Sequence, residues 1–286
     1  MALAETGYTA VRLTREGAVV TLTLDNPPIN TLDKALATDL FRFVRSVRDD
    51  ESVRVIVVES ADAEFFSAHA DLKWMFEPEE LTTLADPGGD PNLNPLQQLH
   101  ERFRTLPQVT IAKLRGRARA GGVELAMAAD MRFAAAGATW LAQPETRMGI
   151  FPGGGGTQYL TRLVGRARAL EIVLGAELFG TDLAERYGWI NRAIDPAGLD
   201  AFVTALAHRI AALPPGVAEA AKQAIDAAEA GGPVPDLREE GRAHAKVYPA
   251  PQVVVDRMRR AVEAGAQTRD AELDLEGLFD ALDATG

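Results

Sequence analysis

The chain contains no cysteine among its 286 residues. This absence excludes disulfide scaffolds, thiol catalysis and thiolate metal sites, and it agrees with a reducing compartment. Basic residues are in the minority, since 30 Lys and Arg stand against 41 Asp and Glu, a formal net charge of −11. Nucleic-acid binding depends on a basic face, so nucleic acid is not expected as the main partner. The net charge does not exclude binding of a small anionic ligand, because such a ligand needs only a local group of cations or a helix N-terminus.

Long apolar runs and targeting signals are missing as well. No run approaches the roughly 20 residues that span a bilayer, and the first residues do not join a basic segment to an apolar one. We therefore expect no membrane partner and a cytoplasmic location. The four histidines are too scattered to predict a metal site. Apolar residues at 47% and charged residues at 25% are ordinary for a globular chain that buries a sizeable core.

Hydrophobic periodicity predicts strands and helices that alternate up to about residue 195. Alternation over 20–24 predicts a strand, apolar spacing over 32–47 an amphipathic helix, and the β-branched run 53–58 a buried parallel strand. The other expected elements are strands at 109–112, 131–135 and 190–194, and helices at 121–127, 166–174 and 181–188, the last capped by Thr181 and Asp182. Pattern alone therefore predicts an open parallel α/β sheet over residues 1–195, followed by an all-helical region over 196–286.

One connecting segment stands out by its composition. Residues 78–95 are rich in Pro, Gly and Asp, which predicts a mobile loop. Two interpretations stay equally open: a tolerated surface insertion, or a lid over a binding site.

Four segments place glycine or a carboxylate where a strand passes into a loop or a helix. They are 65–73, 116–124, 143–145 and 151–157. Taken singly, each has a structural explanation: Gly121 can belong to a plain turn, Glu124 is favoured by a helix dipole, and Glu145 can be a solvated loop residue. The four-glycine run lacks the Gly-Lys-Ser/Thr ending of a P-loop, and no Gly-x-Gly-x-x-Gly follows a strand, so nucleotide-binding motifs are not supported.

Taken together and in this order, the segments resemble the crotonase superfamily, which includes enoyl-CoA hydratases and isomerases. Residues 66–73 are similar to its Phe-Ser-Ala-Gly-Ala-Asp-Leu-Lys, and 120–127 to its Gly-Gly-Gly-x-Glu-Leu-Ala-Met. Residues 143–145 and 152–158 are similar to its Gln-Pro-Glu and Pro-Gly-x-Gly-Gly-Thr-Gln. The resemblance covers about residues 12–195 and implies a crotonase-type β/α spiral core, assembled as a homotrimer or a dimer of trimers.

The resemblance also implies roles for individual residues. The substrate would be an acyl-CoA thioester, with coenzyme A as part of the substrate and no permanently bound cofactor. The backbone N–H groups of Ala70 and Gly121 would form an oxyanion hole on the thioester carbonyl. Glu124 and Glu145 would hold one water for addition to a 2-enoyl-CoA, and the N–H of Gly153 would help to place it. The residues implied to contact coenzyme A are Ala68, Ala70, Asp71, Leu72 and Gly121.

The chemistry of the glutamate pair can also be argued from the residues. Two carboxyl groups around one water can divide the roles of base and acid, with proximity raising the pKa of one of them. Glu124, at the start of a helix, should ionise the more readily. Glu145, close in sequence to Trp140, Met148 and Phe151, is expected to lie in drier surroundings and to keep a proton.

Several positions depart from the family pattern. His69 occupies a glycine of that pattern, and its side chain is expected to point away from the ligand. A hydrolytic triad of Ser67, His69 and Asp71 is disfavoured, because alternate residues of a strand share a face without the required mutual geometry. The acidic stretch 273–279 stands where the family commonly has Phe and Lys at the rim of the nucleotide pocket.

Two further assignments stay open. The basic run Lys113, Arg115, Arg117 and Arg119 could serve the phosphates of coenzyme A or form a solvated charged strand. The region 196–286 is expected to contribute to oligomerisation and to the pocket rim. Its apolar stripe consists of Val253, Val254, Met258 and Val262.

Enoyl-CoA hydration is thus the function that the resemblance favours. The rivals within the same fold are enoyl-CoA isomerisation and hydrolysis or decarboxylation of an acyl-CoA. A rival from another class is a non-catalytic acyl-CoA binder, against which the retention of both glutamates weighs.

Overall fold

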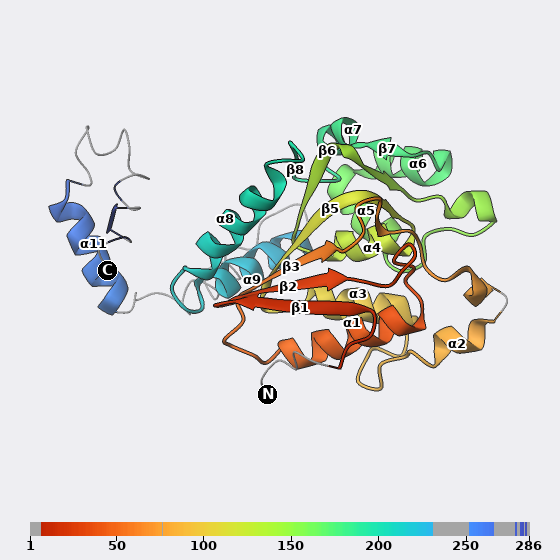
Figure 1. Cartoon of the computed structure of the whole chain (residues 1–286), viewed down its shortest axis with the longest axis horizontal. Helices are drawn as coiled ribbons and strands as arrows, with labels where there is room; N and C mark the ends of the chain where they lie inside the picture. Colours follow the sequence, from red (N-terminus) through yellow and green to blue (C-terminus); the bar gives the residue numbers. More distant parts are fainter. Residues whose placement is uncertain are drawn as a thin grey trace. The chain divides into compact units, whose positions relative to one another are not determined.

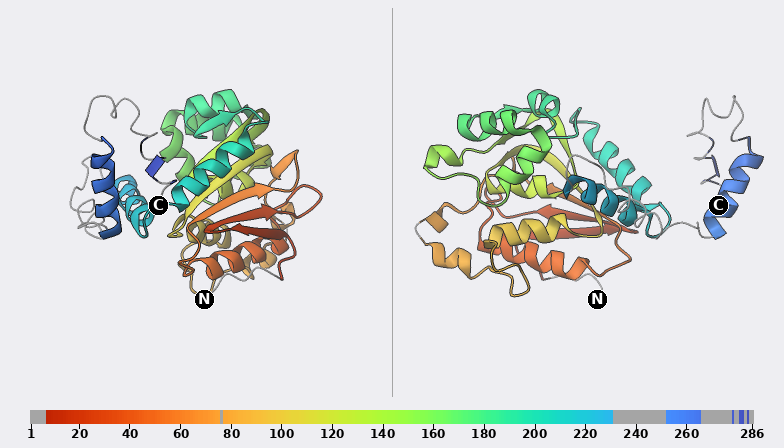
Figure 2. Two further views of the ribbon diagram at one scale, coloured as in Figure 1. Left: turned by 60° about the vertical axis from the view of Figure 1, so that its left-hand side comes forward. Right: turned by 180° about the vertical axis from the view of Figure 1, so that it is seen from behind.

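The chain divides into two compact units, Met1–Ala212 and Leu213–Gly286. The computed structural model describes residues 7–75, 77–230 and 252–265 and the single positions 278, 281, 282 and 284. Figures 1 and 2 show the ribbon from three directions. None of the helices described is long and apolar enough to cross a membrane.

The first unit is built on a sheet that has eight strands in the described part of the chain. The strands are β1 (Val11–Glu16), β2 (Val19–Leu24), β3 (Val55–Ser60), β4 (Phe65–Ser67), β5 (Val109–Arg119), β6 (Met131–Ala142), β7 (Phe179–Gly180) and β8 (Arg192–Ile194). The helices are α1 (Lys34–Val47), η1 (Leu72–Met75), α2 (Pro78–Thr82), α3 (Pro95–Arg104), α4 (Gly121–Ala128), η2 (Glu145–Met148), α5 (Gly156–Val164), α6 (Arg166–Gly175), α7 (Thr181–Tyr187) and α8 (Leu199–Ala211).

The sheet runs in the order β1-β2-β3-β5-β6-β7, with β4 beside β5 and β8 beside β6. Most neighbours are parallel, as the strand and helix alternation predicted. Two pairs are antiparallel: β1, which the pattern did not predict, pairs with β2, and the two-residue β7 pairs with β6. An α/β core with a parallel-rich sheet is therefore confirmed.

Both faces of the sheet are covered, because apolar residues alternate between them along each strand. On β3, Ile56 and Val58 join the larger core with α1, α3 and α4, whereas Val55 and Val57 join a second core under α8. Figure 1 shows α8 on the side of the sheet away from α1 and α3. This arrangement leaves the C-terminal ends of the central strands to the loops that lead into η1, α4 and η2.

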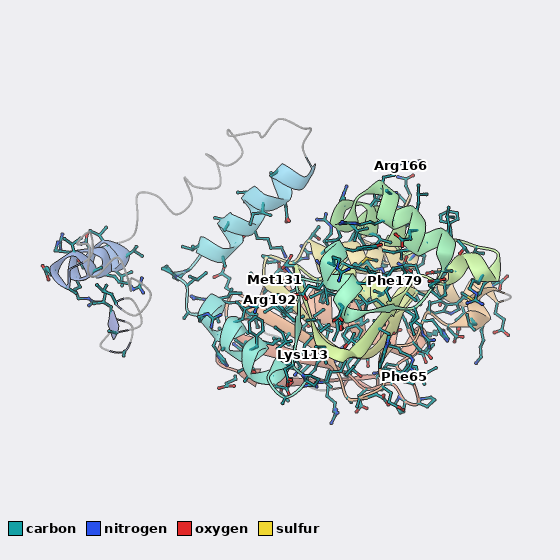
Figure 3. The ribbon with its side chains drawn as sticks, turned by 90° about the horizontal axis from the view of Figure 1, so that it is seen from above. Phe65, Lys113, Met131, Arg166, Phe179 and Arg192 are labelled. Carbon is teal, nitrogen blue, oxygen red and sulfur yellow. The ribbon has the colours of Figure 1, made fainter. Side chains whose placement is uncertain are left out.

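Strands β5 and β6 run much further than the predicted strands 109–112 and 131–135. The first half of β5 pairs with β3, its second half pairs with β4, and the register shifts between Leu114 and Gly116. Along β6 the partner strand likewise changes, from β8 to β7. Figure 3 labels Arg192 of β8 and Phe179 of β7. The apolar runs in the sequence predicted only the first halves of β5 and β6. The second half of β5 was missed because it alternates Arg with small residues.

Gly116 makes the change of partner on β5 possible. Its φ of +67° lies in the left-handed region, and an added Cβ would lie 2.1 Å from the carbonyl carbon of Glu64. The backbone N–H of the next residue, Arg117, donates to the same Glu64 carbonyl at 2.8 Å. Glycine is thus required at this bulge by both conformation and space.

Two further predictions of local structure need correction. Residues 78–95 are not a featureless loop: α2 occupies 78–82, and the buried Asp86 is bonded to Gln98 and Arg102 of α3. Thr181 does not cap α7, since Gly180 precedes the first turn and the Thr181 hydroxyl accepts the N–H of Gly137 at 3.0 Å. The sequence pattern could not distinguish a cap from a tertiary hydrogen bond.

The second unit contains α9 (Val217–Ala230) and α11 (Gln252–Glu263). On α11, Val253 and Val262 are 70% and 53% exposed in the single chain. The side chain of Met258 and the acidic stretch 273–279, position 278 apart, lie outside the described residues. The first unit ends at Ala212 and so includes α8 together with the sheet, whereas the predicted boundary between the α/β core and the helical region stands at residue 195. The roles expected of the C-terminal region stay predictions.

Replacing Gly116 by alanine should lower the free energy of unfolding by about 3 kcal/mol or more, because strain at positive φ adds to a collision with the backbone. Gly137→Ala is the matched control, since Gly137 has a φ of +66° but nothing within 4 Å of an added Cβ. We expect the control to lose only about 1 kcal/mol. Urea unfolding of both variants measures the difference, and equal losses would contradict the role given to the Glu64 contact.

Candidate active site

Two unpaired backbone N–H groups lie side by side where β4 and α4 meet. Leu32 donates to His69 O at 2.9 Å and accepts from the Asp71 N–H at 3.1 Å, so the N–H of Ala70 between them points to the other side of the strand. Gly121 begins α4, and the first N–H groups of a helix have no partner within the helix. A Cβ on Gly121 would lie 3.3 Å from the Ala70 nitrogen. Neither N–H has an acceptor in the described part of the chain, so the pair can receive an anionic oxygen.

The chain reaches this position through a strained turn. Ala120, just before α4, has φ +47° and ψ −128°, a conformation that costs a residue with a side chain about 1–3 kcal/mol. Its N–H donates to Ala142 O at 3.0 Å, which ties the turn to the end of β6. Gly122 allows α4 to approach β4, since an added Cβ would lie 2.4 Å from Ser67 O. Tertiary contacts therefore hold the two donors in place.

Glu124 lies in the first turn of α4 and is 2% exposed. Its Oε1 accepts the backbone N–H groups of Gly154 at 2.9 Å and Gly156 at 2.8 Å. Burial raises the pKa of Glu124 to about 7, although the two N–H donors favour the charged form. The carboxyl group can therefore gain or lose a proton near neutral pH.

Glu145 begins η2 and is 5% exposed. Its pKa is raised to about 8, mainly by burial and in addition by the charge of Glu124, while the Glu145 backbone N–H opposes the shift. The Gln143 amide, oriented so that its NH₂ group donates, lies 3.0 and 3.1 Å from the two Glu145 oxygens. A Cβ on Gly156 would lie 2.5 Å from the same amide and 2.7 Å from Glu124 Oε1, so the Gln143 amide and the Glu124 carboxyl group both pack against Gly156.

The two carboxyl groups titrate in the expected order, but for another reason. Glu145 was expected to lie in drier surroundings, and this is wrong, because Glu124 is the more buried of the two. Glu124 has the lower pKa because two backbone N–H groups stabilise its charge, whereas the charge of Glu124 itself disfavours ionisation of Glu145. The pair titrates as a unit and holds at least one proton at neutral pH.

The glycine loop before α5 presents one more donor. Gly153 O accepts from Asn94 Nδ2 at 2.8 Å, and the N–H of Gly153 has no acceptor in the part of the chain that the structure describes. The neighbouring Gly154 already bonds Glu124. The Gly153 N–H, which is next to a ligand of Glu124 in the chain, is therefore available for the predicted role of placing a water.

The residues expected to contact coenzyme A line the segment that contains Ala70. Ala68 is fully buried and donates its N–H to Ile29 O at 3.1 Å, so only its carbonyl remains for a ligand. Asp71 accepts the Lys73 N–H at 2.9 Å, and Leu72 is 44% exposed. Their binding roles stay predictions.

The three residues of the disfavoured triad bond the backbone separately. Ser67 Oγ donates to Asn30 O at 2.7 Å, the His69 Nδ1 lies 2.9 Å from Ala70 O, and Asp71 accepts a backbone N–H. None of these contacts joins one of the three side chains to another.

The basic run on β5 divides into two pairs. Lys113 and Arg115 bond Asp200 of α8 at 2.7 and 3.1 Å, which fastens α8 to the sheet (Lys113 is labelled in Figure 3). Arg117 and Arg119 each lie 5.8 Å from the ring of Phe65. The first pair is therefore occupied by structural ion pairs.

Sequence reasoning missed two residues of this site. Gln143 stood inside a recognised motif, and its position two residues before Glu145 was a usable signal. His100 is fully buried on α3 and its Nδ1 lies 2.6 Å from Gly154 O. A single histidine in an amphipathic helix carries no signal of such a contact.

Known proteins resemble the chain over most of its length. The family model described as enoyl-CoA hydratase/isomerase matches residues 14–249. A candidate enoyl-CoA hydratase of Bacillus subtilis is 39% identical over 171 residues, 59% of this chain and 62%, less than two thirds, of that protein. The carnitinyl-CoA dehydratase of Escherichia coli is 35% identical over 190 residues, 66% of this chain and 70% of that protein. The solved structure of a candidate enoyl-CoA hydratase from Streptomyces avermitilis is 44% identical, with a TM-score of 0.74 over 97% of this chain and 100% of that one.

Stability should fall with rising pH because of the buried pair. Both glutamates have a higher pKa in the folded chain than in the unfolded one, so their contribution is complete below about pH 4.5 and is lost as pH rises through 7 and 8. At pH 9 we expect Glu145→Gln to be more stable than the wild type, by an amount on the order of a few kcal/mol. At pH 4.5 the two should be equal. Urea unfolding across this range measures the effect, with Glu171→Gln as the control outside the site, and parallel stability curves would contradict it.

Proposed function

Because the chain belongs to the enoyl-CoA hydratase/isomerase family, we propose that it is an enoyl-CoA hydratase, which adds water to the double bond of a 2-enoyl-CoA thioester. The observation that carries this proposal is the buried pair Glu124 and Glu145, with a pKa of about 7 and about 8, in a site where the N–H groups of Ala70 and Gly121 have no acceptor among the described residues. Each part matches a chemical demand of the reaction.

The thioester carbonyl would bind the N–H groups of Ala70 and Gly121. When oxygen adds at C3, electron density moves through C2 onto the thioester oxygen, which becomes enolate-like. Donors already fixed at that oxygen favour this charge, at about 2.7–4 kcal/mol for each donor. The Ala68 carbonyl, Asp71 and the exposed Leu72 would lie along the coenzyme A portion.

The two carboxyl groups would divide the proton transfers. Ionised Glu124 takes a proton from the water whose oxygen bonds to C3, and protonated Glu145 gives its proton to C2. The free N–H of Gly153 would orient that water. With both partners on one side of the substrate, as the family resemblance implies, the addition would be syn, and the pair as a whole would end with as many protons as it began with.

Isomerisation of the double bond is the nearest alternative. It moves one proton between two carbons of the same substrate, for which a single carboxylate suffices. By family resemblance Glu145 is the carboxylate common to both reactions, and a pure isomerase can lack Glu124. The presence of Glu124, bonded to two backbone donors, supports hydration.

Assembly enters the proposal through the family resemblance. A homotrimer or a dimer of trimers would give the exposed Val253 and Val262 of α11 a surface to cover them.

Mutation of the two glutamates tests the hydratase proposal. With crotonyl-CoA, the wild type should bleach the absorbance of the enoyl thioester. Glu124→Gln should lower the hydration rate by ~10² or more, the usual scale for one general acid or base, with nearly unchanged affinity. Glu145→Gln should abolish hydration and any isomerase activity together, and Glu171→Gln outside the site should change neither.

The opposite outcomes are equally definite. Hydration by Glu124→Gln at the wild-type rate would contradict the two-carboxylate mechanism and favour an isomerase. No bleaching by the wild type, with bound crotonyl-CoA, would favour a non-catalytic binder.

A further inference from the structure

A buried histidine on α3 lies next to the carboxyl pair. The pKa of His100 is lowered to about 4 by burial, so its imidazole is neutral at neutral pH. The partner of Nδ1 is the Gly154 carbonyl, at 2.6 Å, which can only accept. Nδ1 therefore carries the proton and Nε2 does not, and Nε2 is buried without a partner in the described part of the chain.

Gly154 connects this imidazole to Glu124. Its carbonyl accepts from His100, and its N–H donates to Glu124 Oε1 at 2.9 Å. A Cβ on Gly154 would lie 2.4 Å from Glu124 Oε2 and 3.1 Å from His100 Cε1. His100 and Glu124 thus pack against the same glycine, and they are hydrogen-bonded to its carbonyl and its N–H group, respectively.

Asn94, the N-cap residue of α3, and Glu101 within α3 hold the same segment. Asn94 Nδ2 donates to Gly153 O at 2.8 Å, and Glu101 Oε1 accepts from the Tyr159 hydroxyl at 2.7 Å. Three side chains of α3 and its N-cap therefore bind the segment 153–159. This segment supplies both N–H groups on Glu124 and the free N–H of Gly153.

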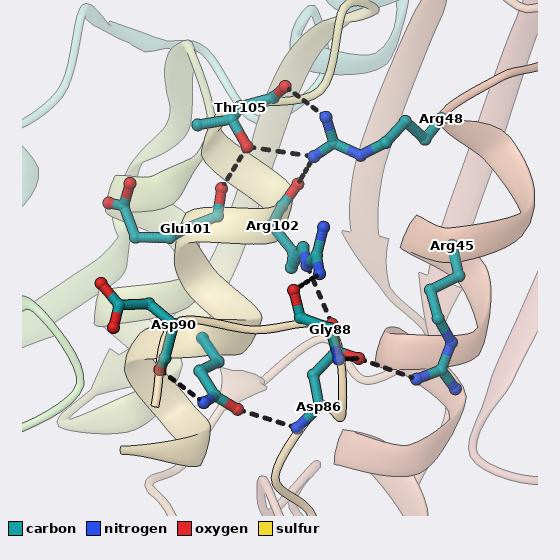
Figure 4. Close-up of polar contacts among 9 residues, drawn as sticks. Arg45, Arg48, Asp86, Gly88, Asp90, Glu101, Arg102 and Thr105 are labelled. Carbon is teal, nitrogen blue, oxygen red and sulfur yellow. Dashed lines mark hydrogen bonds and ion pairs between the residues drawn. The ribbon is translucent and has the colours of Figure 1, made fainter. Parts of the chain in front are cut away.

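Helix α3 is itself anchored on its other side, as Figure 4 shows. Arg48, the C-cap residue of α1, donates to the carbonyls of Arg102 and Thr105 at 2.8 and 3.0 Å. Arg102 Nε donates to Asp86 at 2.8 Å, and Asp86 also pairs with Arg45 of α1 at 3.8 Å. The helix can therefore act as a fixed support for the glycine loop.

We propose that His100 is a positioning residue: its neutral imidazole fixes the Gly154 peptide and thereby keeps the Gly154 N–H on the Glu124 carboxylate. The proposal builds on the proposed function, because Glu124 is the base of that reaction. It assigns to α3 a task beyond packing, namely to hold the base in its ionisable state near neutral pH.

The charged groups around Glu124 allow this effect to be isolated. Glu145 of η2 and Tyr159 of α5 interact electrostatically with Glu124, and Tyr159 in turn interacts with Glu101 and Arg104 of α3. The pKa of Glu101 is lowered by Arg104, Tyr159 and Arg162 despite burial, and that of Tyr159 is raised far above its usual range by burial and Glu101. The pKa of Glu124, about 7, and that of Glu145, about 8, lie between pH 6 and 9, where kcat/KM against pH reports them, whereas that of His100, about 4, lies below this range.

The test compares four proteins with crotonyl-CoA: the wild type, His100→Phe, His100→Asn and Phe103→Leu. Loss of the imidazole donor loosens an N–H that favours ionised Glu124, so His100→Phe should move the acidic limb of the profile upward by about half a unit or more. At pH 7 kcat should fall about twofold or more, as the smaller ionised fraction of Glu124 requires, and KM should stay within about twofold. His100→Asn, whose Nδ2 can replace Nδ1, should restore the limb. Phe103→Leu removes packing from the same helix and should leave it unmoved.

A second readout separates this inference from the proposed function. Infrared titration of ¹³C-glutamate-labelled protein without substrate follows the Glu124 carboxyl, assigned by its loss in Glu124→Gln. The same upward shift is expected in His100→Phe. If the wild type does not hydrate crotonyl-CoA, the hydratase proposal falls, and this titration alone decides the role of His100.

Three outcomes would overturn the proposal. One is a folded His100→Phe whose Glu124 titrates as in the wild type. The second is an equal shift in Phe103→Leu, which would reduce His100 to packing. If His100→Phe does not fold, His100→Gln replaces it in the test, because the longer Gln side chain carries its amide beyond the Nδ1 position and cannot donate to Gly154 O in the same way. The third outcome is an unchanged pKa of Glu124 in His100→Gln.

Discussion

The candidate site depends on a buried carboxylate that two loop N–H groups hold in place. Glu124 is almost without solvent contact, and a carboxyl group in such surroundings would keep its proton well above neutral pH if burial acted alone. The N–H groups of Gly154 and Gly156 oppose that effect. The balance leaves a group that changes charge near pH 7, where a general base is most effective. The shape of the 152–156 loop thus sets the proton chemistry of the site.

Most of the fold could be predicted because apolar alternation and helical spacing report burial directly. This holds for β2, β3, α1 and α6, whose faces pack against one of the two cores. It fails where structure depends on distant contacts. Only Val11 of β1 is buried, so no sustained apolar alternation marks this strand, and the second half of β5 is a strand only because β4 and β6 flank it beyond the bulge at Gly116.

The candidate site was predictable where the chemistry lies in recognisable runs, and not where it depends on tertiary neighbours. Glu124, Glu145, Ala70 and Gly121 belong to motifs, and the structure brings the first two into one electrostatic pair and the N–H groups of the last two together. The relative acidity of the glutamates depends on N–H groups some 30 residues away along the chain. His100 lies 54 residues from the carbonyl it binds. No local pattern could have connected these residues.

The central claim is that the two buried glutamates share protons near neutral pH. Its most direct measurement is the proton uptake of the pair, taken as the difference in potentiometric titration between the wild type and the Glu124→Gln, Glu145→Gln double variant. The account predicts a difference of two protons that are released mainly between about pH 6 and 9, around the pKa of about 7 and about 8 of the pair. Release of both protons near the ordinary glutamate pKa of about 4.3 would contradict it.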